Sequence, residues 1–379
     1  MKKIMADQKK IVIVLSSLAI GGTEKEVINI ARNINTKRFQ TELWLFQKKG
    51  EFLKFLPKTV KVIDLKKKNK LSFFRITIQM AILIRKNRPD LLLQFTTNHS
   101  GLVSLVANWL SGKKTKVAIS IRNLTSKKLE LEGRLKQIIA KWVIRFFYNY
   151  ADNFLVNSMA IRKDLISQFK LSPEKISLIY STVDRKAIKS MVKEKIGSKI
   201  DRNCNLLIIV SRLVEQKRIK LLIKTFSYLP KRLKVRLMII GSGSKKKKLE
   251  DLVNRLEIVD KVIFMGNKKN PYKFMKQAKV LLLGSLIEGC PHVLLEAMEL
   301  GLVCIVVNYP GAKEIINEEN GVLVKSIDPR KIARKVDRLL SNQKRMNKLI
   351  KKGKKKVKAY RIKRVIKDYE IWIDQAINV

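Results

Sequence analysis

The sequence predicts an α/β protein with two domains, each a doubly wound parallel sheet with helices on both faces. Three observations lead to this expectation. Short unbroken runs of Val, Ile and Leu recur along the 379 residues, and such runs indicate strands buried on both faces. Helical patterns or polar loops fill the gaps between the runs, which is typical of parallel strands with crossover helices. A polar, lysine-rich stretch without a strand-like run, residues 185–205, divides the runs into two series.

The runs give the predicted strands and domains in chain order. The first series is Ile11–Leu15, Leu43–Phe46, Val60–Leu65, Leu91–Phe95, Val117–Ile121, Phe154–Val156 and Ile176–Tyr180. The second is Leu206–Val210, Val235–Ile240, Val262–Met265, Val280–Leu283, Cys304–Val307 and Val322–Val324. We predict an N-terminal domain over 1–185, a linker over 186–205 and a C-terminal domain over 206–360. Residues 361–379 are predicted to form a helix with one apolar side, made by Val365, Tyr369, Trp372, Ile373 and Ala376.

An amphipathic helix is predicted from Leu135 to Tyr150, because apolar residues recur there at the spacing of one helix face. Its polar side carries Arg134, Lys136, Lys141 and Arg145. We interpret the apolar stripe as the face that packs on the first sheet. The alternative is that this helix rests on an anionic lipid surface.

Composition limits the partners and the compartment. The net charge is +51, from 82 Lys and Arg against 31 Asp and Glu, with a basic run from Lys344 to Lys367 that contains no acid. Such a field favours nucleic acid, acidic lipid or phosphorylated substrates, although a lysine-biased composition is the plainer explanation. No apolar run reaches the roughly 18–20 residues that span a bilayer. The three cysteines form no disulfide framework and no zinc-ligand spacing, so a reduced cytosolic compartment is expected.

The stretch from Ser285 to Ala297 carries the most specific chemical information. Glu288 and Glu296 stand eight residues apart, with a Gly-Cys-Pro turn between them and an apolar run just before. A strand, a turn and a helix start would aim backbone N–H groups and the positive helix end at an anion such as a diphosphate. Ionised carboxylates only accept hydrogen bonds, which suits hydroxyl groups. A diphosphate joined to hydroxyls describes a nucleotide sugar.

This stretch resembles the E-x7-E signature of the retaining glycosyltransferases of family four, which have the GT-B fold. The match continues through Glu299 and Gly301 to Pro310-Gly311 and Glu314. The resemblance implies two Rossmann-like domains facing a cleft, with the C-terminal helix crossing back to the first domain. It also implies that the first domain binds the acceptor and the second binds the nucleotide sugar.

The resemblance assigns donor contacts to the second domain. The stretch from Ser211 to Lys217 resembles the family's G-R-L-x-x-x-K-G loop, in which Arg212 and Lys217 would clamp the diphosphate. Ser211 and Arg218 replace the two glycines of that loop, and Arg218 puts the tight turn in doubt. Glu288 would bind the donor sugar and Glu296 the ribose. The other donor-binding residues implied are Gly241, Gly266, Asn267, Gly289, Cys290, Pro291, Val293 and Leu294.

Three further positions follow strands of the first domain. Gly21, Gly22 and Thr23 resemble the family's G-G-x-E loop near the diphosphate or acceptor. His99 follows another strand and is a candidate acceptor contact. Arg122 stands where many relatives have a histidine that faces the donor sugar, and this form resembles relatives that transfer galactose-type or N-acetylhexosamine sugars.

We therefore expect a retaining, metal-independent hexosyltransferase that uses a nucleotide sugar, UDP-linked, and needs no cofactor. Its expected acceptor is a lipid-linked glycan for lipopolysaccharide, capsule or protein glycans, at the cytoplasmic face of an anionic membrane. Arg212, Lys217, Glu288 and Arg122 are the expected catalytic residues, and no metal site or nucleic-acid partner is expected. One alternative is a nucleotide-sugar epimerase of the same fold. A remote alternative, prompted by the charge, is a nucleic-acid-binding protein.

Overall fold

The computed structural model describes residues 8–69, 72–95, 100–112, 115–196 and 204–378. The chain divides into two compact units, the first formed by Met1–Thr182 with Ile362–Val379 and the second by Val183–Arg361. The segment predicted as a linker over 186–205 therefore belongs to the second unit. The first helix of that unit is α7 (Arg185–Met191). Asp184 caps this helix by accepting a hydrogen bond from the Ala187 N–H at 3.0 Å.

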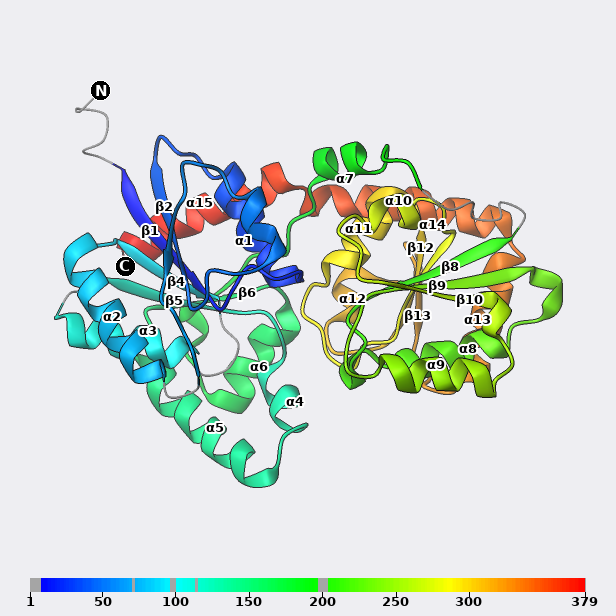
Figure 1. The fold of residues 1–379 in the computed structure, drawn as a ribbon, viewed down its shortest axis with the longest axis horizontal. Coiled ribbons are helices and arrows are strands. Elements are labelled where there is room, and N and C mark those ends of the chain that lie inside the picture. The colour runs from blue at the N-terminus through cyan, green and yellow to red at the C-terminus, as the bar shows by residue number, and fades with distance from the viewer. Residues whose placement is uncertain (1–7, 70–71, 96–99, 113–114, 197–203, 379) are drawn as a thin grey trace. The chain divides into compact units, whose positions relative to one another are not determined.

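The first unit contains a seven-stranded parallel sheet with the order β3-β2-β1-β4-β5-β6-β7. Its strands are β1 (Lys9–Leu15), β2 (Phe39–Leu45), β3 (Lys61–Asp64), β4 (Leu91–Phe95), β5 (Lys116–Ile121), β6 (Asn153–Val156) and β7 (Ile176–Leu178). Its helices are α1 (Gly22–Asn33), α2 (Ser72–Asn87), α3 (Ser100–Ser111), α4 (Thr125–Leu129), α5 (Arg134–Phe147), α6 (Met159–Phe169) and α15 (Ile362–Asn378). In Figure 1, α1 and α15 lie on one face of this sheet and α2 and α3 on the other.

The second unit contains a six-stranded parallel sheet with the order β10-β9-β8-β11-β12-β13. Its strands are β8 (Asn205–Val210), β9 (Val235–Ile240), β10 (Val262–Gly266), β11 (Val280–Leu283), β12 (Val303–Val307) and β13 (Val322–Val324). Beside α7, its helices are α8 (Ile219–Ser227), α9 (Lys246–Arg255), α10 (Tyr272–Met275), α11 (His292–Leu300), α12 (Ala312–Ile315), α13 (Pro329–Leu340) and α14 (Gln343–Lys356). Figure 1 shows α8, α9 and α13 on one face of this sheet and α10, α11 and α14 on the other.

Every predicted apolar run coincides with a strand, so the prediction of two parallel sheets is confirmed. The strand β2 starts four residues before its predicted start at Leu43. The buried polar residues Thr41 and Glu42 interrupt the apolar pattern there, and Glu42 is paired with Lys10 at 3.1 Å. The backbone ladder with β1 runs from Phe39 to Leu45, so β2 extends beyond what an apolar run reveals.

The C-terminal helix α15 packs on the first unit, as predicted. Val365, Tyr369 and Ile373 belong to the same buried cluster as residues of β1, β2 and β4. Lys9 and Arg38 also form ion pairs with Asp374 on its polar side. Burial by itself would raise the pKa of the Asp374 carboxyl, but the contacts with both cations together outweigh it and lower this pKa. The last helix is therefore an integral part of a unit whose other residues come from the start of the chain.

The amphipathic helix α5 forms as predicted, but our interpretation that its apolar stripe packs on the sheet is wrong. Ile144 is its only buried residue. The stripe is at least half exposed at Leu135 (71%), Ile138 (59%), Ile139 (55%), Trp142 (62%) and Phe146 (50%). Trp142 and Phe146 stack with ring centroids 5.4 Å apart. An apolar face that large has no partner within the described part of the first unit.

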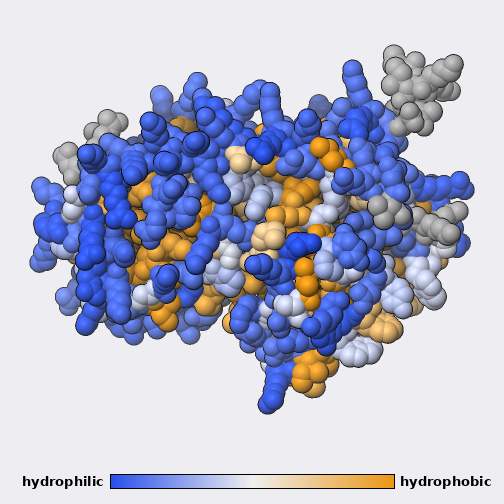
Figure 2. All heavy atoms as spheres, turned by 180° about the vertical axis from the view of Figure 1, so that it is seen from behind, coloured by the Kyte–Doolittle hydropathy of each residue, from blue (hydrophilic) through white to orange (hydrophobic). Residues whose placement is uncertain are grey.

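Hydrophilic residues dominate the face shown in Figure 2, and hydrophobic residues appear on it as separate patches. This agrees with the large excess of Lys and Arg in the sequence. Among the described residues, no helix is both long enough and apolar enough to cross a bilayer.

Candidate functional site

The loops that follow β8 and β11 are joined by hydrogen bonds, and this brings two predicted site residues together. Lys217 Nζ donates to Glu288 Oε1, and the Ser285 hydroxyl donates to the same oxygen at 2.8 Å. The backbone N–H of Leu286 donates to the carbonyl of Gln216 at 2.9 Å. The side chains of Lys217 and Glu288 are only 14% and 11% exposed. A charge-assisted pair of this kind is short and strong when it is shielded from water.

Arg218 keeps the turn that a glycine makes in the resembling family. Its φ of 48° and ψ of 40° place it in the left-handed region, which costs a residue with a side chain about 1–2 kcal/mol. The guanidinium offsets this cost, because Nε donates to the Gly284 carbonyl at 2.7 Å and Nη2 to the Ser285 carbonyl at 2.9 Å. The doubt raised by Arg218 is thus resolved, since the chain turns here without glycine.

The glycine turn after β9 packs directly on the loop after β8. A Cβ atom at Gly241 would lie 2.9 Å from the carbonyl carbon of Ser211, and its oxygen is closer still. The N–H of Leu213 donates to the Ser242 carbonyl at 2.8 Å, and the N–H of Gly241 donates to the Gly266 carbonyl at 2.9 Å. The carboxyl ends of β8, β9 and β10 therefore meet at one edge of the sheet, where open α/β sheets bind their ligands.

Helix α11 carries the second acid of the motif. Glu296 is 4% exposed, and its Oε1 accepts a hydrogen bond from the Tyr272 hydroxyl at 3.0 Å. The N-cap residue of the helix is Pro291, which offers no side-chain hydrogen bond to the first turn. Gly289 and Cys290 are buried just before it. The positive end of α11 thus begins three residues after the Glu288 carboxylate, and such an end suits an anion.

Tyr309 is a residue of this region that the sequence analysis missed. It follows β12, is 3% exposed, and its hydroxyl has no hydrogen-bond partner within the described chain. Burial raises the pKa of Tyr309 well above its ordinary value, and the nearby carboxylate of Glu288 raises it further. Tyr272 was missed as well. No motif marks either tyrosine, although Tyr309 directly precedes the Pro310-Gly311 pair that the resemblance includes.

The other residues predicted to bind the donor lie on the loops after β8 and β10 and at the start of α11. The Arg212 side chain is exposed in the loop after β8, and no hydrogen bond or ion pair of its guanidinium is found among the described residues. Gly266 has a φ of 65°, and Asn267 beside it is exposed. Val293 and Leu294 occupy the first turn of α11. The structure thus pairs Lys217 with Glu288, buries Glu296 and leaves Arg212 open to solvent.

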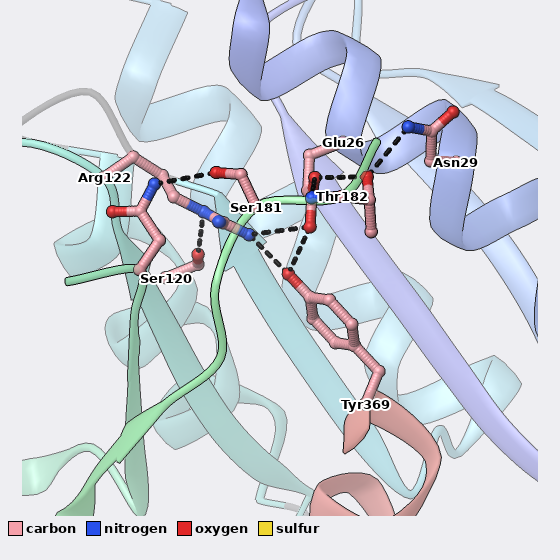
Figure 3. Close-up of polar contacts among 8 residues, drawn as sticks. Glu26, Asn29, Ser120, Arg122, Ser181, Thr182 and Tyr369 are labelled. Carbon is pink, nitrogen blue, oxygen red and sulfur yellow. Dashed lines mark hydrogen bonds and ion pairs between the residues drawn. The ribbon is translucent and has the colours of Figure 1, made fainter. Parts of the chain in front are cut away.

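In the first unit, Arg122 is buried in a network instead of being open to a ligand (Figure 3). Its Nε donates to the Ser120 hydroxyl at 3.1 Å, its Nη2 donates to the Tyr369 hydroxyl, and Nη2 lies 3.8 Å from Glu26 Oε1. The cation expected to face the donor sugar is therefore engaged by groups of its own unit.

The glycine loop after β1 leads directly into α1. Gly21 is its N-cap in extended conformation, with φ −166°, and no side chain caps the helix. Gly22 is exposed and Thr23 half-buried. His99 lies outside the described residues. Within the ranges that the structure describes, no group of three or more His, Cys, Asp and Glu side chains is arranged to hold a metal ion.

Comparison with known proteins gives two domain matches that together span most of the chain. Residues 20–187 match the model of Glycosyltransferase Family 4, and residues 191–356 match that of Glycosyl transferases group 1. These matches fall on the first and second units in turn. They confirm the resemblance that rested on the E-x7-E motif.

Individual relatives agree with the domain matches. The chain is 28% identical over 273 residues to the N-acetylgalactosamine-N,N'-diacetylbacillosaminyl-diphospho-undecaprenol 4-alpha-N-acetylgalactosaminyltransferase of Campylobacter jejuni, covering 72% of this chain and 73% of that protein. It is 25% identical over 377 residues to the GalNAc-alpha-(1->4)-GalNAc-alpha-(1->3)-diNAcBac-PP-undecaprenol alpha-1,4-N-acetyl-D-galactosaminyltransferase of the same organism, covering 95% and 97%.

The fold has solved counterparts. Anabaena HepE, solved in complex with UDP and glucose, superposes with a TM-score of 0.82 at 18% identity, covering 97% of this chain and 100% of that one. Together with the two parallel sheets, this likeness confirms the predicted GT-B fold. With a Family 4 domain in its first half and a group 1 domain in its second, the chain belongs to the family-four glycosyltransferases.

Proposed function

We propose that this protein transfers a hexose or N-acetylhexosamine from a UDP-linked sugar to a lipid-linked glycan, with retention of anomeric configuration. The pairing of Lys217 with Glu288 carries the proposal, because it places a cation and a hydroxyl-accepting carboxylate beside the open N-terminus of α11. A diphosphate bound to a sugar needs both groups within one site. The two Campylobacter relatives, whose names specify undecaprenol-diphosphate glycans, support the lipid-linked acceptor. HepE, solved with UDP and glucose, supports the donor.

In the proposed reaction, the bond from the sugar C1 to the diphosphate oxygen breaks while C1 bonds the acceptor oxygen on the same face. The acceptor hydroxyl gives its proton to the leaving diphosphate, so atoms and charge balance. Negative charge grows on the diphosphate, and Lys217, Arg212 and the start of α11 stabilise it. Glu288 holds the sugar hydroxyls and Glu296 the ribose. These cations take the part that a metal ion plays elsewhere, so no cofactor is proposed. A glycosyl–enzyme adduct would contradict this route.

A thermal shift assay with UDP, GDP and a short oligonucleotide tests the donor. A nucleotide at 100 times its dissociation constant adds about 2.7 kcal/mol of apparent stability, or about 5–10 °C for a unit of this size. We expect UDP to stabilise the wild type and Glu296→Ala to lose most of that shift, because the carboxylate held by Tyr272 would be gone. A response to GDP would move the donor to another base.

The control is Asp337→Ala, which removes a carboxylate of the same unit that pairs with Arg232 through both oxygens at 2.6 and 2.7 Å. It should keep the full UDP shift. If only the oligonucleotide stabilises the protein, the charge marks nucleic-acid binding and the donor assignment is wrong.

We also propose that the protein acts as a peripheral protein on the cytoplasmic face of an anionic membrane, with α5 as its contact. The exposed stripe of α5 is flanked by Arg134, Lys136, Lys141 and Arg145. Apolar side chains enter the acyl boundary while basic side chains meet anionic headgroups. This chemistry would hold the enzyme near a lipid-linked acceptor.

Replacing two stripe residues should release the protein from vesicles. For Ile139→Glu with Trp142→Glu, we expect affinity for phosphatidylglycerol vesicles to fall about tenfold or more, because two apolar side chains no longer enter the lipid. Cosedimentation measures the bound fraction. The control is Val259→Glu with Ile327→Glu, two exposed apolar residues of the second unit at 59% and 65% exposure. Equal losses in both double variants would assign binding to general charge and not to α5.

A further inference from the structure

The two units are joined by two peptide bonds, Thr182–Val183 and Arg361–Ile362. In the first unit, one buried carboxylate holds both arriving segments (Figure 3). Glu26 is 0% exposed, and its Oε2 accepts hydrogen bonds from the Thr182 N–H at 2.9 Å and from the Thr182 hydroxyl at 2.7 Å. Its Oε1 accepts from the Tyr369 hydroxyl on α15 at 3.0 Å. Burial raises the pKa of Tyr369, so this hydroxyl keeps the proton that it donates.

In the second unit, another carboxylate, that of Glu299, contacts the residues that lie across the same two peptide bonds. Glu299 Oε1 lies 3.0 Å from Arg185 Nε, two residues after the first bond. Both Glu299 oxygens accept hydrogen bonds from Arg361, which directly precedes the second bond, at 3.3 Å. The segments also pair with each other, since the Val183 N–H donates to the Tyr360 carbonyl at 2.8 Å and Val183 bridges Arg361 in parallel.

Each of these carboxylates stands on a helix that starts at a candidate substrate loop. Glu26 lies on α1, just after Gly21, Gly22 and Thr23. Glu299 lies on α11, one turn after Glu296 and behind the turn that holds Glu288. If either helix moves at its substrate end, its carboxylate moves with it, and the hydrogen bonds of that carboxylate would displace the two connections. The pairing of the segments makes both connections respond together.

We propose that Glu26 and Glu299 are positioning residues that fix both connections between the units and couple them to the helices carrying the substrate loops. The inference rests on the proposed function in one respect: transfer brings a donor held by one unit to an acceptor held by the other. Two single covalent connections would leave that relation loose. Two clamped, mutually paired connections restrict it, and small errors in the position of reacting groups cost much rate.

Distance measurements and kinetics test the proposal on four single variants. Thr182→Val weakens the first clamp by removing the hydroxyl that donates to Glu26 at 2.7 Å, and Glu299→Ala removes the carboxylate of the second. Neither change touches a predicted donor contact. Their matched controls are Thr115→Val, which removes a buried hydroxyl bonded to Pro89 at 2.9 Å, and Asp337→Ala, which removes an arginine partner of the second unit. Spin labels at Thr59→Cys and Lys247→Cys, both exposed positions, report the distance distribution between the units in a Cys204→Ser background.

We expect the distribution to widen for Thr182→Val and Glu299→Ala and to stay unchanged for the controls. We also expect kcat to fall about tenfold to a hundredfold for the two clamp variants, with the donor KM and the UDP thermal shift kept. A distribution that stays as narrow as in the controls would overturn the proposal. So would a lost UDP shift in Glu299→Ala, because Glu299 would then serve the donor directly. If the wild type transfers no sugar but the distribution widens, the clamp stands and the proposed function has failed.

Discussion

Lys217→Ala is expected to lower kcat/KM for the nucleotide sugar by about 10²–10³, the loss typical of one preorganised group that stabilises developing charge. The lysine reaches the site from the short helical turn after β8 and meets Glu288 there. Without it, the growing charge of the leaving diphosphate would lose a fixed cation. Glu288 would keep only the Ser285 hydroxyl at 2.8 Å as a partner in this contact network. Steady-state kinetics with the donor that the thermal shift identifies would measure the loss.

The matched control is Lys245→Ala. Lys245 is also a lysine close to the loop after β8, and it pairs with Glu215 at 2.7 Å. This pair is solvent-exposed, with Glu215 76% exposed, and exposed pairs contribute little. We expect kcat/KM within about twofold of wild type for this variant, since it removes a cation of equal charge without touching Glu288. Equal losses for both lysines would show that general positive charge, and not Lys217, serves the donor.

Much of the fold could be predicted because burial on both faces leaves unbroken apolar runs, and each run became a strand. The start of β2 could not, because Thr41 and Glu42 are polar residues buried within the strand. The ion pair with Lys10, about thirty residues earlier in the chain, compensates the burial of the Glu42 charge. A local pattern carries no information on a partner that only the folded sheet supplies.

The places of two predicted motifs in the fold could be read from the sequence, because they depend on local backbone turns. The Gly241 turn and the E-x7-E stretch lie at strand ends as the motifs indicated. Tyr272 and Tyr309 approach the acids from other elements, so no spacing in the sequence reveals them. Arg122 also illustrates this limit. Its position after β5 was clear, whereas its engagement by Tyr369 depends on a helix 247 residues away.

The stripe of α5 shows a further limit of periodicity. The pattern correctly indicated a helix with one apolar face, but it does not state what covers that face. In the structure the face is exposed. A hydrophobic stripe is compatible with a protein core and with a lipid surface alike, and only the arrangement of the neighbouring elements separates the two.

Gly241→Ala is expected to destabilise the second unit by about 2–5 kcal/mol, the sum of a steric clash and backbone strain. The φ of Gly241 is 140°, a conformation that residues with a side chain rarely adopt. The added Cβ would also collide with the Ser211 carbonyl group. To relieve this clash, the loop after β8, which carries Arg212 and Lys217, would have to move away from the loop after β9. At about 2–4 °C per kcal/mol, we expect Tm to fall by about 4–20 °C in a thermal melt.

Substitutions at two other glycines distinguish the contribution of the steric clash from that of the backbone strain. Gly266 has a φ of 65°, but a Cβ there would meet nothing within 4 Å, so Gly266→Ala should cost only about 1 kcal/mol of backbone strain. Gly133 has a φ of −61° and equally open surroundings, and it is the N-cap residue of α5. Alanine caps a helix less well than glycine but also lowers the entropy of the unfolded chain, and because these effects oppose each other Gly133→Ala should change Tm little. We therefore expect Gly133→Ala to have the highest Tm of the three variants, Gly266→Ala a lower one and Gly241→Ala the lowest. A Gly241→Ala protein as stable as Gly266→Ala would mean that the loop after β8 yields readily and is not held rigid by this packing. Since Arg212 and Lys217 stand on that loop, the placement of these two side chains, which we propose to bind the diphosphate, depends on the same contact.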